Sequence, residues 1–355
     1  MKRLPTVSII MPVRDEARYI ERSLGAVAAQ DYPQHLLEII VADGMSTDGT
    51  RSILQNLRAE HPNLRVIDNP RKIVSTGLNA ALGLARGEMI IRVDGHCEIA
   101  RDYVRCCVAH LLGKDVDGVG GPIETMGETS TAQSIALAMS SRFGVGDSAF
   151  RTVRDRPMLV DTVAFPAYRR EAVLKAGPFD EELVRNQDDE YNYRLRDSGG
   201  KLLLAPDVHS RYYSRSSLGR LWKQYFQYGH WKVRVLQKHI GQMCLRQFVP
   251  PAFVLALLGG TCIFLLRPHS GVLLAFVGGA YALANLASSV WVASHRGWRH
   301  LPLLPVVFAI LHIGYGFGFL TGLIRFAHRW RDREGKLPGL SGFEGWPSEE
   351  EPLPL

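Results

Sequence analysis

Three polar clusters in the sequence have residue types and spacing that could carry chemistry. The first, Asp94-Gly95-His96-Cys97-Glu98, follows directly after an apolar stretch. In an extended segment, side chains two residues apart share one face, so Asp94, His96 and Glu98 are expected to lie together. Carboxylate and imidazole ligands suit Mn²⁺ or Mg²⁺, and the imidazole favours Mn²⁺. A solvated acidic loop is the alternative, and the motif alone does not decide between the two.

The second cluster, Asn186-Gln187-Asp188-Asp189-Glu190, places three carboxylates side by side. Like charges this close repel, so at least one pKa should rise, which suits a general base. Acidic residues are also favoured at a helix N-terminus by the helix dipole. A purely structural role for these carboxylates therefore stays open.

The third cluster is Gln227-Tyr228-Gly229-His230-Trp231. Its Trp and Tyr side chains could anchor a membrane interface, where such rings are enriched. They could equally form a wall beside a bound acceptor, with His230 near a phosphate group. The sequence leaves both interpretations open.

The first two clusters belong to a stretch in which strand-like and helix-like segments alternate, up to about residue 207. Strands are predicted at 7–11, 37–41, 64–67 and 89–93, and helices at 16–29, 50–60 and 75–85. This alternation predicts βαβ units and a mostly parallel sheet, whose ligand site lies beyond the carboxyl ends of the strands. Polar side chains stand at those ends: Arg14 and Glu16 after the first strand, Asp43 after the second, and Asp94 after a later one.

The last third of the chain has a different character. It contains no Asp or Glu from 208 to 331, and the runs 247–266, 268–294 and 300–324 contain no charged residue. Each run reaches the length of about 20 residues that a helix needs to cross a bilayer. The bases around these runs therefore indicate anionic lipid headgroups rather than nucleic acid. A basic soluble domain is excluded because the runs are too long and too apolar to be solvated.

Segment 220–246 is basic, aromatic and amphipathic, which predicts a helix lying in the membrane interface. The expected organisation is a catalytic domain over 1–210, an interfacial segment over 211–246, membrane helices over 247–325 and a tail over 326–355. Three crossings would place the tail opposite the first domain. The five bases and two acids of 325–336 favour the same side instead. If one of the three runs is re-entrant or interfacial, the number of crossings agrees with the charge of the tail. The sequence does not say which run this is.

The five cysteines show no paired framework and no CxxC spacing, which is typical of a reducing compartment. The N-terminal residues contain no signal-peptide core. We therefore expect a multi-pass protein of the inner (plasma) membrane whose first domain is cytoplasmic.

Several segments resemble family 2 glycosyltransferases, which are inverting enzymes with a GT-A fold. The resemblance begins at Ser8–Glu16 (SIIMPVRDE) and Val41–Thr50 (VADGMSTDGT). It continues in order through Ala167–Glu171, Gly177–Asp180, Asn186–Arg194 and the Gln227 cluster. It covers nearly all of the chain and is strongest with the ExoA-type branch, which is associated with succinoglycan biosynthesis. Each motif is loose, but together and in the right order they are specific.

The resemblance implies a role for each cluster. Pro12, Arg14 and Glu16 would line the nucleotide pocket, Asp43 would contact the base, and Asp94 would lie beside the donor. Asp94 and His96 occupy the place of the family's Asp-x-Asp metal motif, with His in place of the second Asp. Glu98 matches a further ligand position in dolichyl-phosphate mannose synthases.

The resemblance also assigns the acceptor side. Asp189 matches the catalytic base, and Asp188 and Glu190 are neighbours that would tune it. Gln227, His230 and Trp231 match the Gln-x-x-Arg-Trp motif of processive members, with His in place of Arg, which weakens the case for a processive polymerase.

The implied reaction is a single displacement from a UDP-sugar onto a lipid-linked saccharide, assisted by Mn²⁺ or Mg²⁺. One alternative is direct glycosylation of a polyprenyl phosphate, which needs less of a base. Another is a membrane protein that binds a nucleotide without catalysis. The apolar runs contain no Asp, Glu, Lys or Arg that would mark a transport path, so this last alternative is weak.

Overall fold

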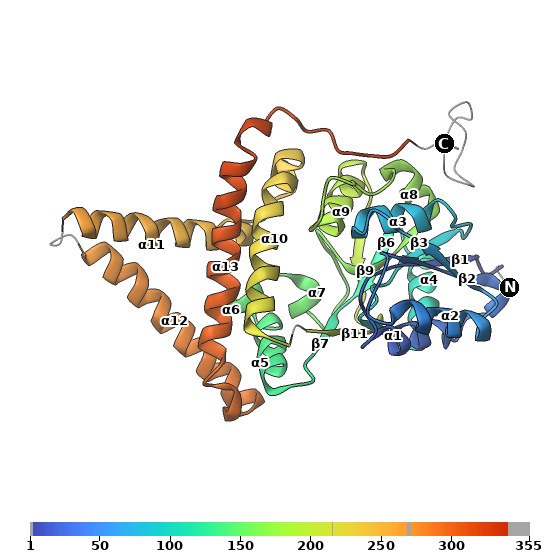
Figure 1. Ribbon diagram of the computed structural model, residues 1–355, viewed down its shortest axis with the longest axis horizontal. Helices are drawn as coiled ribbons and strands as arrows, with labels where there is room; N and C mark the ends of the chain where they lie inside the picture. The colour runs from blue at the N-terminus through green and yellow to red at the C-terminus, as the bar shows by residue number, and fades with distance from the viewer. Residues whose placement is uncertain (1–2, 215, 268–270, 340–355) are drawn as a thin grey trace. The chain divides into compact units, whose positions relative to one another are not determined.

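The computed structural model describes residues 3–214, 216–267 and 271–339. These residues divide into two compact units (Figure 1). The sheet unit contains 3–124, 153–212 and 335–339, and the helical unit contains 125–152 and 213–334. Both units are discontinuous in sequence, whereas the predicted domains were consecutive segments. The described part of the predicted tail, 326–339, is divided between the units.

The sheet unit is built on one eight-stranded sheet with the order β3-β2-β1-β4-β9-β6-β10-β8. Strands β1 to β4 are mutually parallel, and β9 runs antiparallel to both β4 and β6. The predicted mostly parallel sheet is therefore confirmed. The strands of this sheet are β1 (Val7–Val13), β2 (Leu37–Asp43), β3 (Leu64–Asp68), β4 (Met89–Arg92), β6 (Gly118–Gly121), β8 (Met158–Leu159), β9 (Ala164–Arg169) and β10 (Leu202–Leu204).

Strand β1 is buried along its whole length, and only one residue of β2 is partly exposed. Continuous burial explains why both strands read as unbroken apolar runs, which is typical of parallel strands covered on both faces. Three shorter strands form a second sheet in the order β5-β11-β7: β5 (Cys97–Ile99), β7 (Ile123–Met126) and β11 (Ser210–Tyr213).

Six helices of the sheet unit complete its fold: α1 (Ile20–Ala28), α2 (Thr50–Glu60), α3 (Val74–Leu82), α4 (Tyr103–Gly113), α8 (Arg170–Ala176) and α9 (Gln187–Asp197). A core cluster joins Leu78 of α3 and Tyr191 of α9 to Ile10, Ile40 and Ile90 of the sheet. Helix α9, which carries the second polar cluster, is therefore fixed to the sheet by its apolar face.

The helical unit contains α5 (Ser130–Met139), α6 (Arg142–Val145), α7 (Ala149–Thr152), α10 (Leu218–Lys238), α11 (Val249–Leu266), α12 (Val272–Arg296) and α13 (Leu304–Arg325). Helices α10 and α13 lie side by side (Figure 1). A Cβ at Gly229 would lie 2.0 Å from the Tyr315 carbonyl oxygen, and one at Gly318 would lie 2.0 Å from the Phe226 carbonyl oxygen. Only glycine permits this approach of the two backbones.

Within the described residues, three helical segments are long and apolar enough to cross a membrane: Leu245–Leu266, Val272–Arg296 and Leu304–Arg325. They confirm the length and composition predicted from the three uncharged runs. Residues 268–270 of the second run lie outside the described residues. These candidate membrane-spanning helices follow the α/β part of the sequence.

Candidate functional site

The loops after β1 and β2 are tied together at one edge of the sheet. The Asp15 N–H donates to Ser46 Oγ at 2.9 Å, and the Glu16 N–H donates to Thr50 Oγ1 at 2.9 Å. Asp15 has a φ of 52°, in the left-handed region that non-glycine residues rarely adopt. The site edge is therefore a fixed surface, with strained backbone at the point where β1 ends.

Asp43, the last residue of β2, is buried, and its carboxylate is held from two sides. Ser46 Oγ donates to it at 2.5 Å, and Arg51 Nη1 donates to it at 2.9 Å. The other Nη of Arg51 reaches Asp68 at 2.7 Å. These contacts fix the orientation of Asp43, and its predicted contact with a nucleotide base stays a prediction.

Pro12 and Arg14 lie at the same edge. Pro12 is buried within β1, in register with Ala42 of β2. The Arg14 side chain crosses over Gly44, where a Cβ would lie 3.0–3.2 Å from three of its carbons. Arg14 is half-exposed, and its guanidinium donates to the Lys72 carbonyl oxygen at 3.4 Å. Gly44 therefore provides the space that lets Arg14 lie along the edge.

The segment from Asp94 to Glu98 corrects a prediction. It is not extended: the Cys97 N–H donates to the Asp94 carbonyl oxygen at 3.1 Å and closes a turn. Glu98 lies beyond this turn on β5, where it faces Arg22 at 3.7 Å. Among the described residues, no three His, Cys, Asp or Glu side chains are grouped to hold a metal ion. The prediction that Asp94, His96 and Glu98 lie on one face of an extended segment was wrong, because the turn breaks the alternation of side chains.

His96 is paired with Glu16, since its Nδ1 lies 2.8 Å from Glu16 Oε1. Its ring also packs edge-on against Tyr212, with 5.1 Å between the ring centroids. Burial alone would lower the pKa of His96, but the hydrogen bond to Glu16 and the nearby Tyr212 and Asp94 raise it to about 9. Glu16 thus orients the imidazole through Nδ1 and leaves Nε2 as the nitrogen suited to a ligand.

This pair makes stability depend on pH in a defined direction. The pKa of His96 is raised from about 6.5 in the unfolded chain, so the pair stabilises the fold fully below pH 6.5. That stabilisation, about 3 kcal/mol, is lost as the pH rises to 9. We expect the thermal midpoint of the wild type in EDTA to exceed that of Glu16→Gln at pH 6.5 and to converge with it near pH 9.5. Glu21→Gln, an exposed position on α1, should show no such convergence; equal midpoints for Glu16→Gln and wild type at pH 6.5 would contradict the pairing.

Arg92 joins the first polar cluster to the second. It is the last residue of β4, its side chain is only 7% exposed, and its Nε and Nη2 donate to Asp94 Oδ1 at 3.2 and 3.0 Å. Its Nη1 lies 3.9 Å from Asp188 Oδ2. Burial alone would lower the pKa of Arg92, but Asp94 and Asp188 raise it above its usual value. A permanent positive charge therefore stands between two candidate site carboxylates.

Helix α9 presents the second cluster in its first turn, after Asn186, which adopts a φ of 60°. Burial and the adjacent Asp189 raise the pKa of Asp188, and Arg92 opposes this. Thr162 Oγ1 donates to Asp189 Oδ1 at 3.2 Å, and Asn192 Nδ2 donates in turn to Thr162 Oγ1 at 2.8 Å. Asp189 is therefore oriented by a hydroxyl that the next turn of the same helix holds.

Glu190 differs from its two neighbours. Its side chain is buried, and Arg194 Nε and Nη2 donate to its two carboxylate oxygens at 2.9 and 3.1 Å. Arg194 also donates to the Ala176 carbonyl oxygen at the end of α8. This pairing gives Glu190 a structural contact between α8 and α9, and its predicted tuning of the base stays a prediction.

The third cluster lies on α10, in the helical unit. His230 Nδ1 is 3.3 Å from Thr321 Oγ1 of α13, and the His230 ring centroid is 5.0 Å from that of Phe326. Trp231 packs on the same ring at 5.6 Å. His230 and Trp231 thus pack against α13 and the residue that follows it, and His230 also stacks on Phe226 of its own helix. The predicted acceptor-side role of Gln227, His230 and Trp231 stays a prediction.

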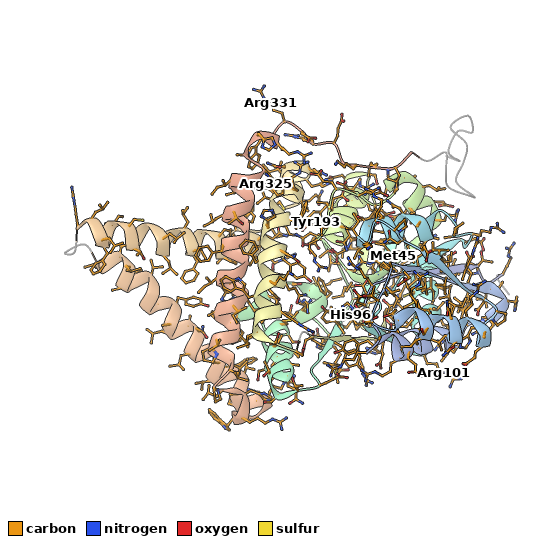
Figure 2. All side chains as sticks on the ribbon, in the orientation of Figure 1. Met45, His96, Arg101, Tyr193, Arg325 and Arg331 are labelled. Carbon is orange, nitrogen blue, oxygen red and sulfur yellow. The ribbon has the colours of Figure 1, made fainter. Side chains whose placement is uncertain are left out.

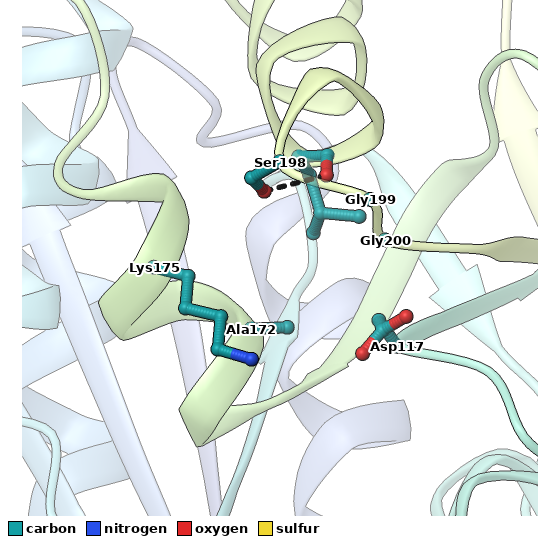
Figure 3. A pocket seen from close by; sticks show the side chains of 7 residues that line it. Asp117, Ala172, Lys175, Ser198, Gly199 and Gly200 are labelled. Atoms are coloured by element: carbon teal, nitrogen blue, oxygen red, sulfur yellow. Dashed lines mark hydrogen bonds between the residues drawn. The ribbon is translucent and has the colours of Figure 1, made fainter. Parts of the chain in front are cut away.

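Two residues of this site, Arg92 and Thr162, are not among the residues predicted from the sequence. Arg92 could have been found, because a charged residue at the end of an otherwise apolar strand indicates a buried pairing. Thr162 gave no signal, since a lone threonine in a loop is unremarkable. A pocket lined by Asp117, Ala172, Lys175, Leu195, Ser198, Gly199 and Gly200 contains no predicted site residue (Figure 3).

The fold and the site together define a class: a GT-A-like α/β unit with acidic and basic groups gathered at the carboxyl ends of β1, β2 and β4. Residues 8–176 match the family described as glycosyl transferase family 2. The chain is 30% identical to the succinoglycan biosynthesis protein ExoA of Rhizobium meliloti (strain 1021), over 90% of this chain and 96% of that protein. The chain therefore belongs to glycosyl transferase family 2.

Two further proteins are similar over most of their length. The dolichyl N-acetyl-alpha-D-glucosaminyl phosphate 3-beta-D-2,3-diacetamido-2,3-dideoxy-beta-D-glucuronosyltransferase of Methanococcus voltae is 26% identical, over 90% of this chain and 97% of that protein. The solved mannosyltransferase PcManGT from Pyrobaculum calidifontis, in complex with GDP-Man and Mn²⁺, matches with a TM-score of 0.56 at 22% identity, covering 88% of each chain. This second likeness supports the fold.

Proposed function

We propose that the protein is an inverting hexosyltransferase that moves a sugar from a UDP-sugar to a lipid-linked saccharide at the membrane. Membership of family 2 supports transferase chemistry, and the name of the Methanococcus voltae relative describes transfer onto a dolichyl-phosphate-linked sugar. The likeness to ExoA supports a place in exopolysaccharide or cell-surface glycan synthesis. The proposed location is the plasma membrane, with the sheet unit in the cytoplasm.

One observation carries the proposal. Arg92 contacts Asp94 through Nε and Nη2 and faces Asp188 through Nη1, so the donor-side carboxylate and the carboxylates of α9 belong to one charged cluster. A displacement at an anomeric carbon needs charge stabilisation on the leaving side and a base on the attacking side. The charged cluster supports the proposal that both groups lie within one unit of the fold.

We propose that the reaction is assisted by a divalent cation, Mn²⁺ or Mg²⁺. Asp94 and His96 would hold it, because their side chains are partly accessible, 22% and 15% exposed, and supply the carboxylate and imidazole ligands that suit these ions. Such a cation neutralises the charge that develops on a leaving diphosphate. His96 must lose its proton to bind a metal, so its raised pKa predicts tighter metal binding as the pH rises.

The remaining proposed roles belong to side chains of the protein itself. Pro12, Arg14, Glu16 and Asp43 would form the nucleotide side of the pocket. Asp189 accepts the proton of the acceptor hydroxyl, which attacks the anomeric carbon from the face opposite the diphosphate, and an α-linked donor then gives a β-linked product. Thr162 holds the Asp189 carboxylate in place, and Gln227, His230 and Trp231 would lie on the acceptor side.

The test is release of UDP from UDP-sugars by detergent-solubilised full-length protein, with a polyprenyl-diphosphate oligosaccharide as acceptor. We expect turnover that depends on the acceptor, is supported by Mn²⁺ or Mg²⁺ and is abolished by EDTA. Equal turnover on bare polyprenyl phosphate would favour the lipid-phosphate transferase instead. Nucleotide binding without turnover on either acceptor would refute the enzymatic proposal.

A further inference from the structure

The segment after the last apolar helix returns to the sheet unit. The Lys336 N–H donates to Asp180 Oδ1 at 2.8 Å, and the Glu181 N–H donates to the Lys336 carbonyl oxygen at 3.0 Å. Asp180 is fully buried, and a Cβ at Gly335 would lie 3.0 Å from its Oδ2. Glycine at 335 thus permits a close approach to a carboxylate that cannot move away. Residues 335–336 are therefore packed against the segment that leads to α9.

The stretch between α13 and this contact cannot cross a bilayer. Only nine residues separate Arg325, the last residue of α13, from Gly335, and 327–329 form a 3₁₀ turn that shortens their reach. They include Arg329, Arg331 and Arg333, which are costly in the hydrocarbon core. Figure 2 marks Arg325 at the end of α13 and Arg331 beyond it. The C-terminal end of α13 must therefore lie on the same side of the membrane as the sheet unit.

We infer that only α11 and α12 cross the membrane, as a hairpin, and that α13 does not. An even number of crossings is required to bring the chain back to the sheet unit. Three crossings, the arrangement that the three apolar runs favour by length alone, would leave residues 335–336 on the wrong side for their contact with Asp180 and Glu181. This inference is independent of the proposed function.

Helix α13 is the apolar helix that stays on the same side of the membrane as the sheet unit, because it packs against the charged helix α10. A Cβ at Gly314 would lie 3.4 Å from Trp222, and one at Gly322 would lie 2.5 Å from the His230 carbonyl oxygen. The two helices thus run in the same direction, and α13 shares its depth with α10. Helix α10 carries exposed Arg220 and Lys223, together with Lys232, Arg234 and Lys238. Exposed Lys223 and half-buried Lys238 are 15 residues apart, about 23 Å along the helix, which is less than the roughly 30 Å of the hydrocarbon core. A crossing would therefore place charge within that core, where it costs up to about 3 kcal/mol, so α10 does not cross and neither does α13.

Burial within the structure distinguishes the same helices. In the most apolar window of each candidate span, 44% of the residues are buried for α13, against 17% for the α11 segment and 11% for α12. Large apolar side chains of α11 and α12 are mostly exposed, among them Leu265, Leu266, Val272, Phe276 and Leu283. So much apolar surface requires a nonaqueous environment. Lipid is the occupant that the length of these two helices fits.

The distribution of positive charge supports the hairpin independently. Arg267 is the single Lys or Arg between α11 and α12. The segments that the inference places on the near side contain many: Lys238 and Arg246 before α11, Arg296 and Arg299 between α12 and α13, and Arg325, Arg329, Arg331, Arg333 and Lys336 from the end of α13. Positive residues are concentrated on the cytoplasmic side of membrane proteins. The hairpin tip with its single base is therefore the part expected on the far side.

The test uses single reporter cysteines and a membrane-impermeant maleimide on sealed vesicles of both orientations. The background is the full chain with Cys244 and Cys262 replaced by Ala. Burial raises the pKa of the thiols of Cys97 and Cys107 well above the usual value and that of Cys106 to about 11, so these three should not react. Reporters are placed at four exposed positions: Leu159→Cys in the sheet unit, Arg267→Cys at the hairpin tip, Trp298→Cys and Glu334→Cys.

We expect Leu159→Cys, Trp298→Cys and Glu334→Cys to be labelled from one face and Arg267→Cys from the opposite face. Labelling of Glu334→Cys together with Arg267→Cys, opposite Leu159→Cys, would show three crossings and overturn the inference. Labelling of Arg267→Cys from the face of Leu159→Cys would show that α11 does not cross and would also overturn it. Only protein that is extracted from membranes by detergent is scored, so a misfolded reporter does not contribute. Protease treatment of sealed vesicles containing the chain with a C-terminal tag gives a second reading, in which the tag and the sheet unit should be cleaved from the same face.

Discussion

Replacing Asp189 by Asn should lower kcat for sugar transfer by about 10²- to 10⁴-fold, the usual contribution of a general base. The amide keeps the size of the side chain and can still accept the hydrogen bond from Thr162, which lies 3.2 Å from Asp189 Oδ1. It cannot accept a proton from the acceptor hydroxyl. KM for the UDP-sugar should change little, because the proposed donor contacts lie on other residues. Initial rates of UDP release with a lipid-linked acceptor measure both constants.

Asp197→Asn is the matched control. It is the same chemical change at the exposed C-terminal end of the same helix, α9, and should leave kcat close to that of the wild type. If Asp189→Asn retained wild-type kcat on a saccharide acceptor, Asp189 would not be the base. A loss shared equally by the control would indicate damage to α9 instead.

Replacing Arg92 by Gln should impair both stability and activity. Arg92 is buried and pairs with Asp94, and breaking a buried pair from one side costs about 3 kcal/mol or more. For a unit of this size that corresponds to a thermal midpoint lowered by roughly 6–12 °C. The loss arises because Asp94 and Asp188 would remain in the cluster without the positive charge that Arg92 supplies.

The pH dependence of kcat distinguishes a role of Arg92 in the activity from a general loss of stability. Arg92 opposes the rise in the pKa of Asp188, so its removal raises that pKa further. The Asp188 carboxylate must be ionised to act beside the proposed base, Asp189. The acidic limb of the profile of kcat against pH should therefore move to higher pH. Arg92→Lys keeps the positive charge but lacks the planar guanidinium group, and it should move the acidic limb less. Arg101→Gln, an exposed position, should change neither the midpoint nor the profile; an unmoved acidic limb in Arg92→Gln would limit Arg92 to a structural role.

The local sequence pattern was sufficient to predict most of the secondary structure of the sheet unit. The helix predicted at 50–60 is α2 with the same bounds, and the predicted strands begin where β1, β2, β3 and β4 begin. The helix predicted at 16–29 begins only at Ile20. The reason is non-local: the N–H groups of Asp15 and Glu16 donate to Ser46, in the loop after β2, and to Thr50, the first residue of α2, which keeps the chain out of the helix.

The site was predictable in its residue types but not in its pairings. The turn closed by Cys97 and Asp94 reverses the chain within four residues, and no hydrophobic period marks such a turn. The pairs Glu16–His96 and Arg92–Asp188 join residues that are 80 and 96 positions apart in sequence. Residues 125–152 pack with the C-terminal helices although they lie within the α/β sequence. These features depend on tertiary contacts, which a single sequence does not display.

We propose that the enzyme transfers a sugar to a saccharide hydroxyl carried by a lipid, with inversion. The most direct test of this proposal is to incubate purified full-length wild type with a UDP-α-sugar and a polyprenyl-diphosphate oligosaccharide, and then to determine the anomeric configuration of the extended lipid product by NMR. We expect one added sugar in a β linkage to a saccharide hydroxyl, formed with stoichiometric release of UDP. An α linkage, or a sugar attached directly to a lipid phosphate, would contradict it.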